Sequence, residues 1–404
     1  MRRLSCAVLL VSMLATSRRP ARAQPPHDTV QALPTPAGPY HLGTAVAYLV
    51  DSTRTASPFA RGRPIVLQLW YPATVTTRVD AATPYLVEPG LLPALLAAPY
   101  YALDTVTLRR WGIETTHSTR DAAVTPGHYP LIVFSVGLGV IRANYTSLAE
   151  ELASHGAVVA IVESPLQGLF VLTDGTIVTD TTASLEDPAN HRAAVRGWTG
   201  DITAVLNRLQ RVTIPGAIAP VARTIDWSRV GAAGHSTGGL VALSACQSDD
   251  RVKACIDLDG GLVAPQGEPI ADFVAAGTVK PTLVLQSEPD YTDADLAKRK
   301  LTRAAWVKRG EAGRHALGAF VARAHGPIWT GHVHGTGHFS FSDGPFVMPS
   351  TITRFGGRLL SWQRTWHVIT GTMRAFFDQE LDGRHDALHD FAATTPELVL
   401  DTGH

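Results

Sequence analysis

Short runs of almost wholly apolar residues alternate with segments of helical spacing along most of this chain. Residues 131–135 and 157–162 predict buried strands, because strands covered on both faces lose the apolar–polar alternation. Between them, residues 144–155 carry apolar side chains at helical spacing and stop before Gly156, a residue that ends helices well. The other predicted elements are strands at 63–72, 229–233, 254–258 and 282–286 and helices at 198–209, 239–247 and 362–381.

This order of elements predicts an α/β fold with a mostly parallel central sheet and helices on both faces. We place one catalytic domain at residues 61–385, preceded by a lead-in at 24–60 and followed by a C-terminal tail at 386–404. Residues 73–125 and 163–190 show no strong period, so we interpret both as insertions that cap the core, the second of them as a loop.

The balance of acidic and basic residues bears on which partners the chain can attract. The chain of 404 residues carries 35 basic and 35 acidic side chains, so its formal net charge at pH 7 is zero. No long-range field therefore recruits nucleic acid or an anionic membrane surface. We expect a small ester or lipid substrate and no nucleic-acid partner.

The N-terminus has the layout of a secretory signal peptide over residues 1–23. A basic start is followed by an apolar stretch at 4–15 and by Ala21-Arg22-Ala23, an A-x-A site, so the mature chain is expected to begin near Gln24. The apolar stretch is too short for a permanent anchor, and no later segment approaches a membrane-spanning run. These features predict a secreted or periplasmic protein.

Two of the three cysteines belong to the predicted mature chain, and export would place them in a compartment where disulfides can form. Cys6 lies in the predicted leader, whereas Cys246 and Cys255 lie at the end of one predicted helix and the start of the next strand. A disulfide between them and a pair of small buried side chains are the two alternatives.

The strongest chemical signal is Gly234-His235-Ser236-Thr237-Gly238, placed between a predicted strand and a predicted helix. A G-x-S-x-G sequence in this context is typical of a nucleophile elbow, a turn so tight that its flanking residues must lack side chains. The sequence therefore predicts Ser236 as a catalytic nucleophile.

A serine nucleophile needs a base and an acid that orients the base. In sheets of this type the acid follows the serine along the chain, at the end of a later strand. Asp257 lies near the end of the strand at 254–258, and Asp259 directly follows it. Strand alternation points both side chains to the same face. We favour Asp259 because it lies at the exit of the strand, beside two glycines; Asp290, after the next strand, is the rival.

The base should be a histidine late in the chain, and residues 331–339 supply it on a predicted loop. Gly335 and Gly337 make this loop flexible enough to bring His338 over the elbow. His332, His334 and His338 also form an H-x-H-x3-H spacing that suits a metal, but no cluster of carboxylates or cysteines stands near it in the sequence. We therefore expect neither a metal nor a cofactor. His235 is expected to point away from the site and to pack.

The oxyanion formed by acyl attack needs two backbone N–H donors. We predict Thr237, the residue after the nucleophile, as one. The other is expected in the glycine-containing loop Val136-Gly137-Leu138-Gly139, where Leu138 is our candidate. A simple glycine-rich strand-to-helix turn is the alternative for this loop.

Taken together, residues 130–139, 152–156, 230–239 and 256–259 resemble the platelet-activating-factor acetylhydrolase family of secreted α/β-hydrolases. The resemblance implies an α/β-hydrolase fold and a calcium-independent serine esterase that cleaves short or oxidised acyl chains from phospholipids. By residue match it assigns Ser236, Asp259 and His338 as the triad and Leu138 as an oxyanion donor, and it favours Asp259 over Asp290.

One position departs from that family. Many members have Ser-His-Gly where this chain has Ser135-Val136-Gly137. Because the oxyanion donor is a backbone group, catalysis need not fail, but the geometry of the loop or the specificity is expected to differ.

The sequence favours a secreted esterase of short-chain carboxylic esters. Two alternatives remain open: a cutinase-like polyester hydrolase, which would use the same triad, and a non-catalytic binding protein on a hydrolase scaffold. The presence of all three triad residues argues against the second alternative.

Overall fold

The structure is a computed structural model of the chain, and it describes residues 31–54, 62–74, 82–97, 105–165, 168–172, 174–178, 187–264, 268–349 and 359–401. The predicted signal peptide and cleavage site lie outside these residues.

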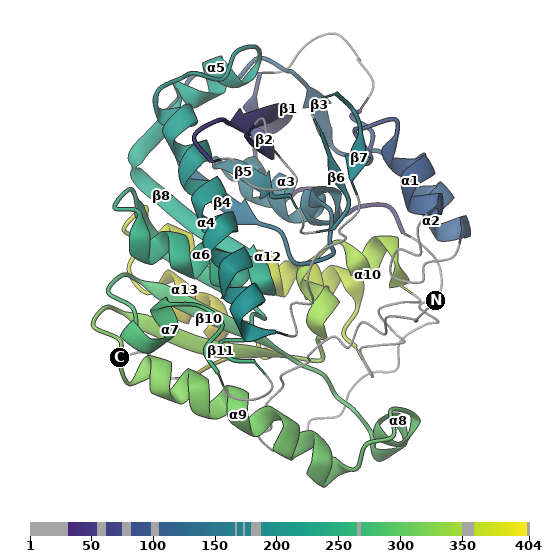
Figure 1. Cartoon of the computed structure of the whole chain (residues 1–404), viewed down its shortest axis with the longest axis vertical. Coiled ribbons are helices and arrows are strands. Elements are labelled where there is room, and N and C mark those ends of the chain that lie inside the picture. The colour runs from purple at the N-terminus through teal and green to yellow at the C-terminus, as the bar shows by residue number, and fades with distance from the viewer. Residues whose placement is uncertain are drawn as a thin grey trace.

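A ten-stranded sheet forms the centre of the described part of the chain, in the order β12-β11-β10-β9-β8-β4-β5-β2-β1-β3 (Figure 1). Its strands from β5 through β4, β8, β9 and β10 to β11 are parallel, whereas β1, β2 and β12 pair antiparallel with their neighbours β2, β5 and β11. The strands are β1 (His41–Asp51), β2 (Arg63–Ala73), β3 (Ser118–Arg120), β4 (Tyr129–Ser135), β5 (Val158–Glu163), β8 (Ile225–His235), β9 (Val252–Leu258), β10 (Thr282–Glu288), β11 (Ile328–His334) and β12 (Leu398–Asp401).

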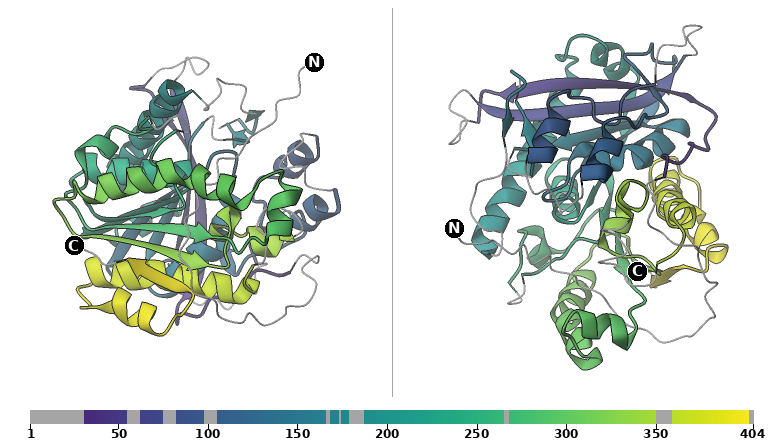
Figure 2. Two further views of the ribbon diagram at one scale, coloured as in Figure 1. Left: turned by 90° about the horizontal axis from the view of Figure 1, so that it is seen from below. Right: turned by 90° about the vertical axis from the view of Figure 1, so that its right-hand side faces the viewer.

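Helices cover both faces of this sheet (Figure 2). One face is covered by α4 (Pro188–Gln210), α6 (Thr237–Ser248) and α9 (Arg303–Val321), and the other by α3 (Thr146–Ser154), α12 (Trp362–Glu380) and α13 (Ala387–Ala393). Side chains along β4 point alternately to the two faces of the sheet. Leu131 and Val133 belong to the apolar cluster on one face, whereas Ile132 and Phe134 belong to the cluster on the other. The predicted α/β architecture is confirmed. Among the described residues, no helix combines the length and apolar character needed to cross a membrane.

A third apolar cluster lies beside the sheet. In it, α1 (Leu91–Ala97) and α2 (Thr105–Trp111) pack against α10 (Gly344–Val347), and the indole N–H of Trp111 donates to the backbone oxygen of Val347 at 2.8 Å. The remaining elements are short: β6 (Phe170–Val171), β7 (Ile177–Val178), α5 (Ile218–Ala222), α7 (Phe273–Ala276), α8 (Asp293–Lys298) and the 3-10 helices η1 (Arg142–Tyr145) and η2 (His338–Phe341).

The central sheet extends beyond residues 61 and 385, the predicted limits of the catalytic domain. The expected lead-in contributes β1, and the expected tail at 386–404 contributes α13 and β12, so both flanks complete the sheet. The sequence pattern missed β1 because small residues and Thr44 interrupt its alternation, and it missed β12 because four residues carry too little periodicity.

Two segments without a clear period also form regular structure. Residues 163–190 were expected to be a loop, but β6 and β7 form a hairpin there and α4 begins at Pro188, where the carboxylate of Asp187 accepts from the N–H of Ala189 at 2.8 Å. Within residues 73–125, β3 pairs with β1 at the edge of the sheet. The predictions also omitted α9, whose three glycines weaken its helical pattern, and β11.

Of the two alternatives for the cysteines, the structure has the disulfide. Cys246 near the end of α6 is bonded to Cys255 of β9, with a Cα–Cα distance of 6.1 Å. The bond joins the helix that begins after Ser236 to the strand that leads to Asp259.

A buried charge cluster fixes the segment before α1 to the sheet. The guanidinium of Arg142 pairs with Glu163 at the end of β5 at 2.5 Å and with Glu88, and its Nε donates to Gln68 of β2 at 3.0 Å. The Arg142, Glu88 and Glu163 side chains are all at least nine-tenths buried. Removing one partner of such a cluster leaves uncompensated charge in the interior.

We therefore expect Arg142→Met to lower the free energy of unfolding by about 3 to 5 kcal/mol, because two buried carboxylates lose their cation. Arg120→Met is the matched control: Arg120 pairs with Asp121 on the surface, both side chains are 56% exposed, and the loss should stay below about 1 kcal/mol. Chemical denaturation of the three proteins measures the difference. Equal losses in the two variants would mean that the buried cluster contributes no more than a surface pair.

Candidate active site

Ser236 lies in a strained turn between β8 and α6. Its backbone has φ 57° and ψ −128°, a conformation that a non-glycine residue adopts only when the surroundings impose it. A Cβ on Gly234 would overlap the backbone oxygen of Gly238, and a Cβ on Gly238 would overlap the backbone of Ser135 in β4. Both glycines are therefore required by close packing, as the predicted elbow demands.

The structure brings the three predicted triad residues together. His338 Nε2 lies 3.1 Å from Ser236 Oγ, and His338 Nδ1 lies 2.8 Å from Asp259 Oδ2. The Asp259 and His338 side chains are 5% and 11% exposed, whereas Ser236 is only half-buried. A partly exposed hydroxyl thus lies beside an imidazole and a carboxylate that are largely shielded from water, as the predicted roles require.

Ser287 in β10 holds the carboxylate of Asp259. Its backbone N–H donates to Oδ1 at 2.8 Å, and its hydroxyl donates to Oδ2 at 2.9 Å. Burial by itself raises the pKa of Asp259, but hydrogen bonds and charge from His338, together with the Ser287 N–H, outweigh it and leave the pKa below its usual range. Sequence reasoning missed Ser287, because its contact depends on the pairing of β9 with β10.

The other two carboxylates considered as the acid lie elsewhere. Asp257 is fully buried; its Oδ1 accepts from Gly260 N–H at 2.9 Å, and burial raises its pKa to about 8. Asp290 is exposed in the turn after β10 and acts electrostatically on His334. Of the three carboxylates, only Asp259 contacts His338 in the described structure.

His235 is buried and does not reach Ser236 as a base. Its Nε2 donates to the backbone oxygen of His338 at 2.8 Å, while its Nδ1 lies 2.8 Å from the Tyr145 hydroxyl. Burial lowers the pKa of His235 to about 3, so the ring is neutral. The expected packing residue is therefore also a positioning residue for His338.

The predicted oxyanion donors stand on the two elements that flank the elbow. Thr237 is the first residue of α6, and Leu138 lies in the loop after β4, whose last residues pair with the end of β8. Gly137 N–H in that loop donates to the Tyr145 hydroxyl at 3.0 Å, which ties the loop to the His235 cluster. Val136, where many family members have His, is buried.

His191 is a site residue that the sequence did not indicate. It lies in the first turn of α4, and its Nε2 is 3.2 Å from the Thr237 hydroxyl. Burial lowers the pKa of His191 to about 4, so a neutral imidazole lies beside Thr237, one of the predicted oxyanion donors. A lone histidine just after the segment interpreted as a loop, and before the predicted helix at 198–209, gave no signal of this contact.

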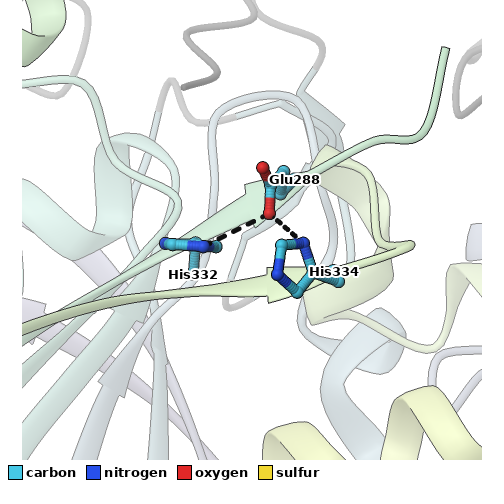
Figure 3. A group of neighbouring side chains, drawn as sticks. All are labelled: Glu288, His332 and His334. Atoms are coloured by element: carbon cyan, nitrogen blue, oxygen red, sulfur yellow. Dashed lines mark ion pairs between the residues drawn. The ribbon is translucent and has the colours of Figure 1, made fainter. Parts of the chain in front are cut away.

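His332 and His334 do not join His338 in a metal site. They belong to β11, where a loop was expected, and both side chains turn to Glu288 at the end of β10 (Figure 3). Burial lowers the pKa of each of the two imidazoles. Glu288, His332 and His334 are the group of described residues with the donor set and spacing to hold a metal ion.

Comparison with known proteins relates this chain to a known family. The family model described as platelet-activating factor acetylhydrolase, isoform II, matches residues 27–167 and 217–391. A platelet-activating factor acetylhydrolase of Gallus gallus is 25% identical over 220 residues, covering 47% of this chain and 51% of the relative. A probable 1-alkyl-2-acetylglycerophosphocholine esterase of Arthroderma benhamiae is 29% identical over 138 residues, covering 33% of this chain and 32% of the relative. The chain thus spans about half, or less, of the length of the curated relatives it matches.

Among solved structures, a ferulic acid esterase from Streptomyces cinnamoneus superposes with a TM-score of 0.71 at 28% sequence identity. The match covers 93% of this chain and 100% of that one. The predicted α/β-hydrolase fold is confirmed by this likeness together with the sheet order. Because the family model matches well over half of the residues, the chain belongs to the platelet-activating factor acetylhydrolase, isoform II, family.

Proposed function

We propose that this chain is an esterase that hydrolyses short-chain carboxylic esters through an acyl-enzyme on Ser236. The observation that carries the proposal is the continuous hydrogen-bond chain from Ser236 through His338 to Asp259 at a strained elbow. Such an arrangement costs backbone strain and aligns a base with a hydroxyl, which a non-catalytic binding protein does not need.

The proposed reaction follows from the positions of the atoms. His338 Nε2 accepts the proton of Ser236 as Oγ attacks the ester carbonyl, and Asp259 stabilises the imidazolium that forms. The N–H groups of Thr237 and Leu138 receive the oxyanion. His338 then gives its proton to the leaving alcohol, and water, deprotonated by the same imidazole, releases the acid from Ser236. This sequence of steps uses no cofactor.

For the substrate, we propose short acyl esters of the phospholipid type, since curated relatives carry the names platelet-activating factor acetylhydrolase and 1-alkyl-2-acetylglycerophosphocholine esterase. A covered acyl site fits this proposal. A Cβ on Gly168 would stand 3.0 Å from Gly139, so the segment before β6 packs against the loop that carries Leu138. We expect this segment to cover the acyl site, which would limit the length of the acyl group.

A second candidate substrate is an aromatic acyl ester. A solved structure whose match covers 93% of this chain is named a ferulic acid esterase. The family model matches residues on both sides of 168–216 but not these, and this unmatched stretch contains His191 and the hairpin of β6 and β7. The acyl preference is therefore expected to depend on this part of the chain.

We also propose that the protein is exported. The basic and apolar segments of residues 1–23 support this, and the disulfide between Cys246 and Cys255 fits an oxidising compartment.

Ser236→Ala should lower kcat by at least about 10⁴-fold, because the variant has no nucleophile. Initial rates on a short-chain nitrophenyl ester measure the loss, and labelling by a fluorophosphonate should disappear with it. Near-normal turnover in a variant with an unchanged melting temperature would contradict the proposed mechanism.

Asp259→Asn should lower kcat by about 10⁴-fold, because the amide no longer stabilises the imidazolium and favours the wrong tautomer of His338. Asp290→Asn is the matched control, and its kcat should stay close to that of the wild type, since Asp290 is exposed and does not contact His338. If instead Asp290→Asn were the more damaging change, the acid would have to be reassigned.

Activity across acyl chains should peak at about two to six carbons. Each added methylene gains about 0.8 kcal/mol only while the pocket can bury it, so kcat/KM should stop rising once the covered site is filled. A panel of nitrophenyl esters, a 2-acetyl phospholipid, a ferulate ester and a polyester film tests the class. Faster cleavage of the ferulate ester would select the aromatic candidate, and comparable release from the film would select a cutinase-like enzyme.

A further inference from the structure

A second cluster of chemically active side chains stands at the carboxyl ends of β10 and β11. The strands are parallel, with Gln286 opposite His332 and Glu288 opposite His334. Residues two apart on a strand share a face, so His332 and His334 project to the same side, where they meet Glu288 (Figure 3). Glu288 Oε2 lies 3.3 Å from His332 Nε2 and also contacts His334 Nδ1.

The donor set and its spacing suit a transition-metal cation. Two imidazole nitrogens and one carboxylate oxygen, one atom from each residue, lie within 4.8 Å of one another. A tetrahedral zinc with bonds of about 2.1 Å separates its ligand atoms by about 3.4 Å, close to the distance between Glu288 and His332. Calcium and magnesium prefer oxygen ligands, so a site with two imidazoles selects against them.

Access and surrounding charge are also suitable. The Glu288 and His332 side chains are 12% and 15% exposed, whereas His334 is 41% exposed, which leaves one side open to solvent. Asp290 and Asp401 add negative charge near His334 and His332, respectively. A cation can enter from the open side and keep water in its remaining position.

We propose that Glu288, His332 and His334 form a binding site for a divalent transition-metal ion of the zinc class, with water as the fourth ligand. The site is separate from the triad, so this proposal does not depend on the esterase reaction.

The position of the cluster gives the ion a structural role beside the active site. Ser287, which holds Asp259, directly precedes Glu288. The backbone oxygen of Glu288 accepts from Gly335 N–H at 2.9 Å, and Gly335 begins the short loop that leads to His338. An ion shared by β10 and β11 therefore fastens together the two strands that support the acid and the base of the triad.

The test uses the mature full-length protein without a polyhistidine tag, stripped with a chelator and titrated with Zn²⁺ by calorimetry and by competition with a chromophoric chelator. We expect saturable binding of one equivalent, no binding of Ca²⁺ or Mg²⁺, and a melting temperature raised by about 3 to 5 °C when zinc is about 100-fold above Kd.

His334→Gln and Glu288→Gln should each weaken zinc binding at least about 100-fold, because each removes a ligand. His389→Gln, which changes an exposed histidine of α13 outside the cluster, should bind as the wild type does. Melting of the metal-free variants shows whether they are folded, and His334 is exposed enough for its replacement to be tolerated. The proposal is overturned if wild-type protein shows no saturable binding up to the millimolar range, or if binding survives in both ligand variants.

Discussion

The candidate active site depends on the backbone of Ser236 being held in the left-handed region. That conformation costs about 1 to 3 kcal/mol at a non-glycine residue, so it persists only where the surrounding packing leaves no alternative. Here β4, β8 and the start of α6 approach so closely that Gly234 and Gly238 have no room for side chains. The Ser236 N–H donates to Leu258 of β9 at 2.8 Å, which fixes the turn from the other side. Packing and hydrogen bonding within the parallel sheet thus offset the cost of the strained Ser236 backbone.

The side chain of His235 connects the elbow to the loop of His338 and, through Tyr145, to the loop after β4. Ser236 directly follows His235 in the sequence, and the buried His235 ring links Tyr145 to the backbone of His338. The Tyr145 hydroxyl in turn accepts from the Gly137 N–H, in the loop that carries Leu138. One neutral, fully buried imidazole therefore fixes the positions of three segments that are distant in sequence. A protonated ring there would leave a charge in the interior, and burial prevents this by lowering its pKa to about 3.

The parts of the site that could be predicted from the sequence are those that depend only on residues close to one another along the chain. The elbow needs only glycines at fixed spacing between a strand and a helix, and the buried strands that carry Ser236 and Asp259 are continuous apolar runs. Contacts that arise from strand pairing could not be predicted in this way. The spacing of His332, His334 and His338 in the sequence offered a metal site only as an alternative, and it could not show that the pairing of β11 with β10 turns His332 and His334 to Glu288. Ser287 and His191 likewise acquire their contacts only when separate elements meet.

The two aspartates around the end of β9 show how one backbone angle separates roles that strand alternation alone would leave equal. Regular alternation would point Asp257 and Asp259 to the same face, but Asp259 follows the last residue of β9 and has φ 56°, which ends the alternation. Asp257 stays beneath the elbow, where a Cβ on Gly239 would collide with its carboxyl group, and burial keeps it protonated up to a pH of about 8. Asp259 turns out toward His338 and Ser287, whose hydrogen bonds keep it ionised. Because a neutral Asp257 adds no second negative charge, Asp259 is the carboxylate that would stabilise a positive charge on His338 in the proposed reaction.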